Sequence, residues 1–311
     1  MKRTALITGG AGFIGTHLAS HLARQGWDIT IVDDLTEGSE TNLEFLGVEA
    51  ELIVLDIAEP GALEVLSGRA FDAIFHLAAQ ASVPMSVERP EVDFRTNVVG
   101  TFHVLEFMRR RNIPKLVFPS TVSVYSPDAE MPLKETTPIH ASSPYGAAKS
   151  AAENYCFAYA SSYGLNVTVL RLFNVYGPLM RKYVIHDLVR KLQRDPTRLV
   201  MLGDGNQVRD YLYVDDAVRA FALAEEKGRK GDVYNVGSGN PVRIADLARK
   251  LADIMGLQKV SFECTMESWP GDIKTWFADL TKIAELGFTP QTPWDEGLRR
   301  TVEYLVGHPA D

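Results

Sequence analysis

Residues 5–15 read Ala5-Leu6-Ile7-Thr8-Gly9-Gly10-Ala11-Gly12-Phe13-Ile14-Gly15. The apolar run that opens this stretch is typical of a buried parallel strand, and a helical pattern follows the glycines. Glycines allow a tight turn and let the backbone approach a pyrophosphate, which rests on the N-terminus of the following helix. The stretch therefore favours the strand, loop and helix of a dinucleotide-binding fold over a purely structural glycine turn.

An acidic residue closes the next predicted strand, which reads Asp28-Ile29-Thr30-Ile31-Val32-Asp33. Asp33 lies near the spacing of about 20 residues at which a carboxylate in such folds holds the adenosine ribose hydroxyls. The same charge would repel a ribose 2′-phosphate, and Asp34-Leu35-Thr36 offers no arginine or lysine to receive one. We therefore expect the cofactor to be NAD rather than NADP.

Strand-like segments alternate with helical ones through the first half of the chain. This alternation predicts an α/β fold with a doubly wound parallel sheet, whose ligands bind at the carboxyl ends of the strands. The further predicted strands cover residues 50–55, 71–77, 115–118 and 166–170.

Two side chains at these strand ends each have two interpretations. Asp56 follows the third strand, where it would either cap a helix or contact adenine. His76, at the end of the fourth strand, is more typical of a histidine with satisfied hydrogen bonds than of a base. The small residues of segment 78–83 would allow a nicotinamide to lie against the backbone.

A second informative stretch reads Ser142-Ser143-Pro144-Tyr145-Gly146-Ala147-Ala148-Lys149. Ser143 suits a helix N-cap and Pro144 the first helical position, so Tyr145 and Lys149 fall about one turn apart on one face. An ammonium beside a phenol favours the phenolate and would lower the pKa of Tyr145, so the pair could move a proton on and off a hydroxyl. The alternative is an ordinary amphipathic helix, but the glycine loop upstream and Ser120-Thr121 in between favour the catalytic pair.

Composition excludes several classes of protein. The 311 residues carry a net charge of -8, and no lysine or arginine run stands out, which argues against a nucleic-acid or anionic membrane surface. Cys156 and Cys264 give no metal-binding spacing and no disulfide framework, so we expect no metal and a cytoplasmic location. The apolar run before Thr8 is too short for a signal peptide or a membrane span.

Motifs along the chain read Gly9-Gly10-Ala11-Gly12-Phe13-Ile14-Gly15, His76-Leu77-Ala78-Ala79, Asn97-Val98-Val99-Gly100-Thr101, Tyr145-x-x-x-Lys149 and Arg171-Leu172-Phe173-Asn174-Val175-Tyr176-Gly177-Pro178. Together they resemble the extended short-chain dehydrogenase/reductases, and within these the nucleotide-sugar epimerases and dehydratases. The resemblance covers nearly the whole chain. It implies an NAD-binding Rossmann domain over residues 1–178 and a smaller C-terminal α/β domain over residues 179–311 for the nucleotide sugar, with some strand exchange between the two.

The resemblance also implies roles for individual residues. Thr121 occupies the catalytic serine or threonine position, Tyr145 is the base and Lys149 its partner. The implied cofactor-binding residues are Gly9, Gly12, Phe13, Ile14, Gly15, Asp33, Asp34, Asp56, Ile57, Leu77, Ala78, Ala79, Asn97, Tyr145 and Lys149.

On the substrate side, the resemblance implies contacts from Ser82, Thr121, Asn174 and Arg209. The guanidinium of Arg209 would meet the diphosphate; the alternative for it is a surface ion pair with Asp204 or Asp210. Trp269 stands where many family members have a second diphosphate arginine, so the sequence does not identify the nucleotide. Arg181 or Lys182 could take over that contact.

The implied activity is that of an NAD-dependent nucleotide-sugar epimerase, with a UDP-hexose 4-epimerase favoured. The alternatives are a nucleotide-sugar 4,6-dehydratase, a keto-sugar reductase and a non-catalytic dinucleotide sensor. Family dehydratases place acidic residues directly after the catalytic threonine, whereas Val122 and Ser123 follow Thr121 here. Neither side chain is an effective acid or base by itself. The acid and the base that elimination of water requires are therefore missing from these positions. A reductase would use the same three side chains, and their presence argues against a sensor.

A homodimer is the expected assembly. The predicted helix from Glu91 to Arg111 and the helix after Ser143 carry large apolar residues, and in the family the equivalent helices meet those of a second copy as a four-helix bundle. The apolar residues in question are Phe102, Leu105, Tyr155 and Phe157.

Overall fold

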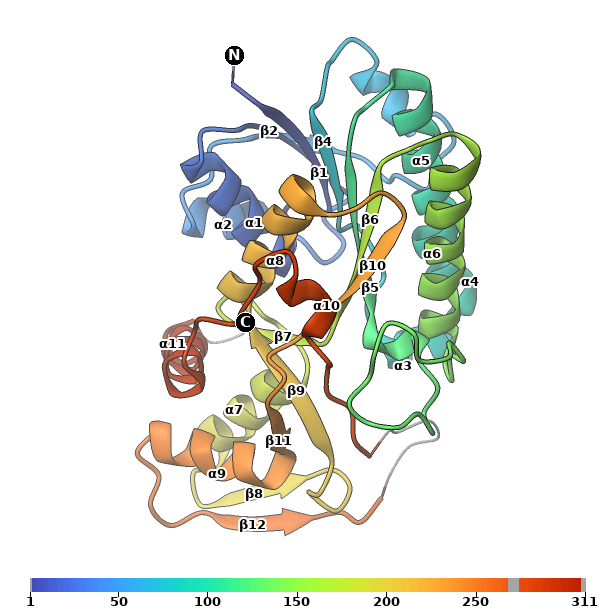
Figure 1. Ribbon diagram of the computed structural model, residues 1–311. Coiled ribbons are helices and arrows are strands. Elements are labelled where there is room, and N and C mark those ends of the chain that lie inside the picture. Colours follow the sequence, from blue (N-terminus) through green and yellow to red (C-terminus); the bar gives the residue numbers. More distant parts are fainter. Residues whose placement is uncertain (1, 268–273, 309–311) are drawn as a thin grey trace.

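The computed structural model describes residues 2–267 and 274–308. Within these residues, a parallel sheet of seven strands lies at the centre, in the order β10-β6-β5-β4-β1-β2-β3 (Figure 1). Every neighbouring pair in it runs parallel, which confirms the predicted α/β fold. The strands are β1 (Thr4–Thr8), β2 (Asp28–Asp33), β3 (Glu51–Val54), β4 (Ala73–His76), β5 (Leu116–Thr121), β6 (Val167–Leu172) and β10 (Asp232–Val236).

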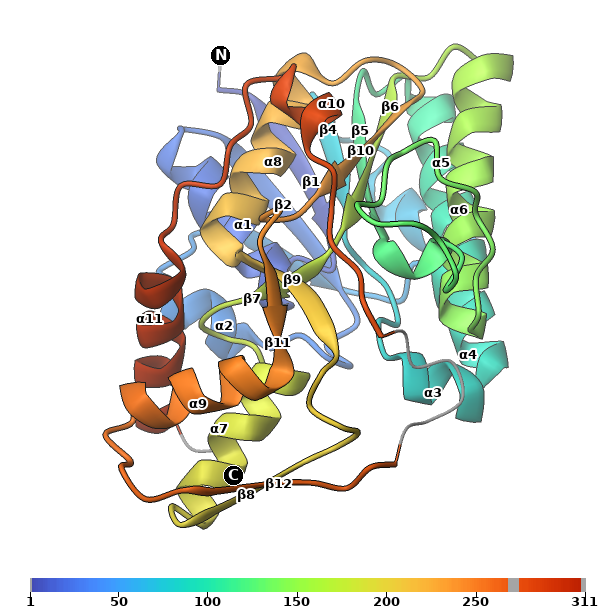
Figure 2. The ribbon, with the colours of Figure 1, turned by 60° about the horizontal axis from the view of Figure 1, so that its bottom comes forward.

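Helices cover both faces of this sheet (Figures 1 and 2). Helices α1 and α8 pack together on one face, and α5 and α6 pack together on the other. None of the described helices is long and apolar enough to cross a membrane. The helices around the sheet are α1 (Phe13–Arg24), α2 (Glu40–Phe45), α3 (Val83–Glu88), α5 (Gly100–Arg111), α6 (Pro144–Ser162), α8 (Val214–Lys227) and α10 (Thr281–Ala284), with a 3₁₀ turn at Ala62–Leu66.

The central strands bury side chains on both faces. Leu6 and Ile74 belong to the apolar cluster that includes residues of α5, whereas Ile7 and Phe75 belong to the cluster that includes residues of α1. This alternation follows from the pleat, which turns successive side chains to opposite faces. Because both faces are covered, these strands read as continuous apolar runs, and that made them recognisable in the sequence.

The predicted helix from Glu91 to Arg111 is continuous but contains a π-helical segment. The chain forms α4 (Pro90–Phe94), a π-helical segment (Arg95–Val99) and then α5. Around this segment the Thr101 hydroxyl donates a hydrogen bond to the carbonyl oxygen of Asn97 at 2.6 Å. Short π-helical turns of this kind are frequent at functional sites.

The second half of the chain builds a smaller layer beside the carboxyl ends of the main sheet. Strands β11-β9-β7 form one sheet and β12-β8 another, and helices α7, α9 and α11 pack together next to them (Figure 2). Strand β10 and helix α8 follow residue 178 yet belong to the layers of the large sheet; the division at 178/179 stays a prediction. The remaining elements are β7 (Asn174–Tyr176), α7 (Val184–Arg194), β8 (Arg198–Met201), β9 (Val208–Tyr213), β11 (Pro241–Arg243), α9 (Ile244–Ile254), β12 (Ser261–Cys264) and α11 (Trp294–Gly307).

Candidate active site

The glycine loop joins β1 to α1 at the carboxyl edge of the sheet. Gly9 has a φ of 70°, and a Cβ placed on it would lie 2.5 Å from the backbone nitrogen of Ala78. A Cβ on Gly15 would lie 2.1 Å from the carbonyl oxygen of Gly9. Both positions therefore require glycine, and the loop packs directly against the segment that follows β4.

The N-terminus of α1 is suited to an anion. Gly12 is the N-cap and offers no capping side chain, so the first N–H groups, from Phe13 and Ile14 on, have no partner inside the helix. Among the described residues, a Cβ on Gly12 would meet only the Gly9 oxygen, at 3.3 Å. The space in front of the helix is thus open and lined by N–H donors, which fits the pyrophosphate of a dinucleotide.

Asp33 ends β2 next to this loop and is buried. One carboxylate oxygen accepts a hydrogen bond from the Ala11 N–H at 2.9 Å, and the other accepts one from the Leu35 N–H at 2.9 Å. Burial raises the pKa of Asp33, and these two N–H donors oppose that rise. Each carboxylate oxygen has two lone pairs, so the group can still accept from a ribose hydroxyl.

Three other predicted cofactor residues have local roles in the structure. The Asp34 carboxylate accepts from the Thr36 N–H at 2.9 Å and stabilises its own turn. Asp56 accepts from the Ala58 N–H at 2.8 Å and forms an ion pair with Arg95 at 2.8 Å. It opens a turn rather than a helix, so it is not a helix cap, and its contact with adenine stays a prediction. Ile57 is buried in the apolar cluster on the α5 side.

The segment after β4 lies against the glycine loop. The N–H of Leu77 donates to the Thr8 carbonyl at 2.8 Å and that of Ala78 to the Thr8 hydroxyl at 3.4 Å, and Ala79 follows at the same edge, half-buried. His76 is buried between the hydroxyls of Thr8 (2.7 Å) and Thr101 (3.0 Å). Burial lowers the pKa of His76 to about 3, which confirms a neutral, hydrogen-bonded histidine.

Helix α6 begins as the sequence predicts. The Ser143 side chain accepts a hydrogen bond from the Gly146 N–H at 3.2 Å, and Pro144 takes the first turn. A Cβ on Gly146 would lie 2.3 Å from the carbonyl oxygen of Ser123, so glycine allows α6 to approach the 3₁₀ turn Val122–Val124. This approach brings Tyr145 close to the Thr121 side chain at the end of β5, near enough for Thr121 to affect the pKa of Tyr145.

Lys149 lies one turn further along α6 and is 3% exposed. Its Nζ sits 4.1 Å from the centre of the Phe118 ring. Burial lowers the pKa of Lys149 to about 8, while Cys156, Glu153 and Asp93 act in the opposite direction.

The expectation that Lys149 lowers the pKa of Tyr145 is wrong for the polypeptide itself. Burial raises the pKa of Tyr145 to about 12; the neighbouring Thr121 side chain opposes this rise and the Asp93 carboxylate adds to it. The physical reason is desolvation, which disfavours both the phenolate and the ammonium; it acts on Tyr145 although part of that residue is still exposed.

A polar cluster on α4 and the π-helical segment borders this pair. The Asn97 amide donates to the Gln80 carbonyl at 2.9 Å and to Asp93 Oδ1 at 3.0 Å, and the Gln80 amide donates to the same oxygen at 3.1 Å. Within the described residues, Asp93 Oδ2, Asn97 Oδ1 and Ser120 Oγ are buried without a hydrogen-bond partner. Such atoms are rarely left unpaired, so they fit a polar ligand such as the nicotinamide ribose. Sequence reasoning found Asn97 but missed Asp93, although the two are spaced as neighbours on one helical face.

The predicted substrate residues lie in three places. Ser82 caps α3 by accepting from the Met85 N–H at 3.3 Å. Asn174 opens β7 and donates to the Asp210 carbonyl at 3.0 Å. Arg209, on β9, donates to the Val208 carbonyl at 3.0 Å, and its guanidinium lies 4.9 Å from the centre of the Trp276 ring.

Two further predictions on the substrate side concern Asp210 and Trp269. The Asp210 carboxylate, one of the two alternative partners of Arg209, accepts from Ser238, Gly239 and Ala278. Its lone pairs are therefore used by other donors. Trp269 lies outside the described residues.

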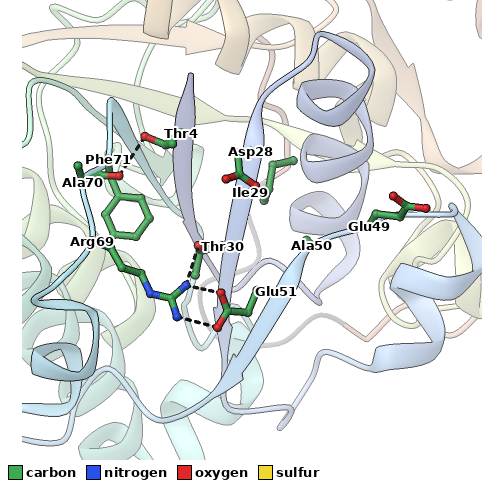
Figure 3. A pocket seen from close by; sticks show the side chains of 10 residues that line it. All are labelled: Thr4, Asp28, Ile29, Thr30, Glu49, Ala50, Glu51, Arg69, Ala70 and Phe71. Carbon is green, nitrogen blue, oxygen red and sulfur yellow. Dashed lines mark hydrogen bonds and ion pairs between the residues drawn. The ribbon is translucent and has the colours of Figure 1, made fainter. Parts of the chain in front are cut away.

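A hollow of about 480 Å³ lies at the opposite edge of the sheet. Figure 3 shows it at the amino ends of β1 and β2, with the Arg69 guanidinium turned toward Glu51 at 2.7 Å. None of the predicted site residues lines it, and its arginine is already paired. Among the described residues, no group of three or more histidine, cysteine or acidic side chains is placed to hold a metal.

Comparison with known proteins agrees with this geometry. Residues 5–237 match the model of the NAD dependent epimerase/dehydratase family. The chain belongs to this family. It is an NAD-dependent enzyme. Three features of the site fit this cofactor: the glycine loop, the N-terminus of α1 and the Asn97 side-chain oxygen that is buried without a hydrogen-bond partner.

Individual members of the epimerase/dehydratase family are similar over almost the whole chain. A putative UDP-glucose 4-epimerase of Methanocaldococcus jannaschii is 33% identical over 306 residues, covering 96% of this chain and 97% of the relative. The structure of UDP-glucose 4-epimerase from Thermotoga maritima with UDP-glucose has a TM-score of 0.90 and 36% identity, covering 98% and 99% of the two chains. The dTDP-glucose 4,6-dehydratase of Streptomyces venezuelae, solved with NAD, has a TM-score of 0.89 and 31% identity, covering 98% and 97%.

Asp33→Asn is expected to weaken the preference for NAD over NADP by about tenfold or more, because it removes the charge that repels a 2′-phosphate. The amide oxygen can still accept one of the two backbone hydrogen bonds. Dissociation constants for both dinucleotides, measured by isothermal titration on protein freed of cofactor, give the ratio. Asp28→Asn, at the amino end of the same strand, is the matched control and should leave the ratio unchanged. An unchanged ratio in Asp33→Asn would remove Asp33 from cofactor selection.

Proposed function

We propose that this enzyme is a nucleotide-sugar 4-epimerase that acts through a transient 4-keto sugar, with a UDP-hexose as the favoured substrate. One observation carries the proposal: Tyr145 lies beside Thr121 at the carboxyl end of β5, and buried Lys149 lies one helical turn away. The similar 4-epimerases support the same activity.

In this mechanism the Tyr145 oxygen takes the proton of the sugar 4-hydroxyl and later returns it. Thr121 donates a hydrogen bond to the same sugar oxygen. Lys149 holds the hydroxyls of the cofactor ribose, and its charge offsets that of the phenolate. When bound, NAD supplies the acceptor for the carbon-4 hydride and then its donor. No net oxidation results, because the hydride returns to the opposite face of the same carbon.

A specific feature separates this activity from dehydration, which a similarly close relative performs. Elimination needs an acid for the leaving hydroxyl and a base for the carbon-5 proton. After Thr121 the chain has Val122, which is buried in an apolar cluster, and Ser123, whose hydroxyl lies 3.3 Å from that of Thr121. Neither is an effective acid or base here, whereas epimerisation needs only Tyr145, Thr121, Lys149 and the cofactor.

The test is incubation of the purified enzyme with a panel of nucleotide sugars, without added dinucleotide, followed by separation of the products. We expect conversion of a UDP-hexose into its 4-epimer. A 4-keto-6-deoxy product would show dehydration instead. Turnover only with stoichiometric reduced dinucleotide would show a reductase, and bound NAD without any turnover would favour a sensor.

We further propose a homodimer built on α5 and α6. Phe94, Phe102 and Tyr155 are 57%, 39% and 44% exposed, and the last two rings meet edge to face at 6.2 Å. Leu105 is fully buried in its own chain, so it is not available to a partner. Phe157 is only partly buried against its own core. The free cysteines are compatible with a cytoplasmic location.

Phe102→Glu is expected to convert the dimer into a monomer of about 34 kDa, the mass of one chain. A charge placed in an apolar contact is left unpaired and desolvated. Light scattering at micromolar concentration measures the mass, with Val306→Glu on α11 as a control at a comparably exposed position. A wild-type protein that is already monomeric would refute the assembly.

A further inference from the structure

The segment 178–183, between β7 and α7, crosses from the substrate side back to the cofactor side of the molecule. Leu179 and Met180 are buried at its start, and Ile185 is buried just after it. Leu179 and Tyr183 have φ values of 70° and 76°, a region that non-glycine residues rarely adopt. Strained backbone of this kind persists where surrounding contacts impose it, often at ligand clamps.

Contacts along the first part of this segment lead to the glycine loop. The His17 ring of α1 donates to the Pro178 carbonyl at 3.1 Å. Arg181 donates to the Asn42 amide oxygen at 3.3 Å, and the Asn42 amide in turn donates to the Ala11 carbonyl at 2.8 Å. The segment is thus tied through one buried side chain to the loop that is suited to the pyrophosphate.

Contacts along the second part reach the loop after β2 and the segment after β4. Lys182 forms an ion pair at 3.1 Å with Glu37, which follows Asp33 on the adenosine side. The Tyr183 hydroxyl donates to the Ala81 carbonyl at 2.9 Å, on the segment after β4. The Tyr183 side chain is half exposed, so this hydrogen bond lies at the surface of the molecule. Burial of the rest of the side chain raises the pKa of Tyr183, with Tyr145 and Glu37 as further causes.

We propose that residues 178–183 form a strap across the dinucleotide crevice and that the Tyr183–Ala81 hydrogen bond is its clasp, which retains NAD through the reaction. The strap joins parts of the chain that flank the cofactor at the glycine loop, at the adenosine side and at the nicotinamide side. NAD leaves only when the clasp opens, because the strap and its two basic side chains span the exit.

Retention has a chemical purpose that rests on the proposed 4-epimerase activity. The same dinucleotide that accepts the hydride from carbon 4 must return it to that carbon. Loss of the reduced dinucleotide before the return would leave a keto sugar and an enzyme without cofactor. A strap that opens slowly relative to turnover prevents this loss.

The clasp is tested by the rate at which bound NAD exchanges with isotope-labelled NAD, followed by mass spectrometry of the intact complex without any sugar present. Tyr183→Phe keeps the ring and removes the hydroxyl, and we expect exchange about 2- to 12-fold faster, the worth of one neutral hydrogen bond. Tyr163→Phe, another half-exposed tyrosine, is the matched control and should exchange like the wild type. If NAD exchanges at the same rate in Tyr183→Phe and in the wild type, the clasp is contradicted. The same holds if neither protein exchanges NAD at all.

A second pair of variants tests the strap independently. Lys182→Glu places two like charges together and should speed NAD exchange, whereas Lys182→Glu combined with Glu37→Lys should restore the wild-type rate. During turnover, Tyr183→Phe should also release more keto sugar, in proportion to its faster exchange. A raised KM for the nucleotide sugar with unchanged NAD exchange would instead assign Tyr183 to the substrate. Faster exchange in an enzyme that epimerises no sugar would keep the strap and refute the proposed function.

Discussion

Tyr145→Phe is expected to lower turnover by about 100- to 10,000-fold while NAD stays bound, the usual worth of a general acid–base group. The ring still fills its place beside Thr121, but the oxygen that carries the proton is gone. Because burial places the pKa of Tyr145 at about 12 in the polypeptide, the phenolate forms only with help from bound positive charge. Turnover of the wild type should therefore rise with pH until the phenolate is fully formed.

The measurement is the steady-state rate of epimerisation together with the amount of NAD that co-purifies. Tyr155→Phe, on the same helix and 44% exposed, is the matched control and should retain wild-type turnover. Lys149→Ala should lose both turnover and bound NAD, since Lys149 serves both. Near-normal turnover of Tyr145→Phe would exclude it as the proton carrier.

Arg171→Met is expected to destabilise the fold by about 3–5 kcal/mol, the usual cost of leaving one member of a buried ion pair without its partner. Arg171 on β6 binds Glu153 on α6 through two hydrogen bonds of 3.0 and 2.7 Å, and their side chains are 3% and 1% exposed. Arg171 also donates to the Tyr125 hydroxyl at 2.9 Å, which donates to Asn235 on β10 at 2.6 Å. The change thus affects how α6, the helix that carries Tyr145 and Lys149, packs against the sheet.

Urea unfolding of the cofactor-free enzyme measures this free energy. The matched control is Arg198→Met, which breaks an ion pair with Glu263 of similar geometry at the surface, where the side chains are 57% and 45% exposed. That change should cost no more than about 1 kcal/mol. An equal loss of unfolding free energy in the two variants would show that the buried ion pair stabilises the fold no more than the surface pair does.

The local signals in the sequence were sufficient for the strands, the glycine loop and the start of α6. Each depends on neighbouring residues alone: apolar runs, glycines that must approach a backbone, and Ser143 before Pro144. Strand β10 was not assigned, because its place beside β6 is set by pairing between residues about 60 apart in the chain.

Sequence analysis missed or wrongly predicted features that depend on contacts in the folded protein. The direction of the shift in the pKa of Tyr145 depends on how far folding desolvates the phenol, which no spacing encodes. Asp93 and Tyr183 are polar residues at ordinary positions in the sequence, and only tertiary contacts with Gln80 and Ala81 give them a role. The π-helical segment at Arg95–Val99 leaves no sequence signal that we recognise.

The most direct test of hydride removal and return at carbon 4 uses a UDP-hexose that carries deuterium at that carbon. The enzyme is incubated with it without added dinucleotide, and proton and deuterium NMR locate the label in the product. We predict an inverted carbon 4 that keeps its deuterium, with the 6-hydroxyl intact. Deuterium at carbon 6 of a 4-keto-6-deoxy sugar, or exchange of the label with solvent, would contradict the account.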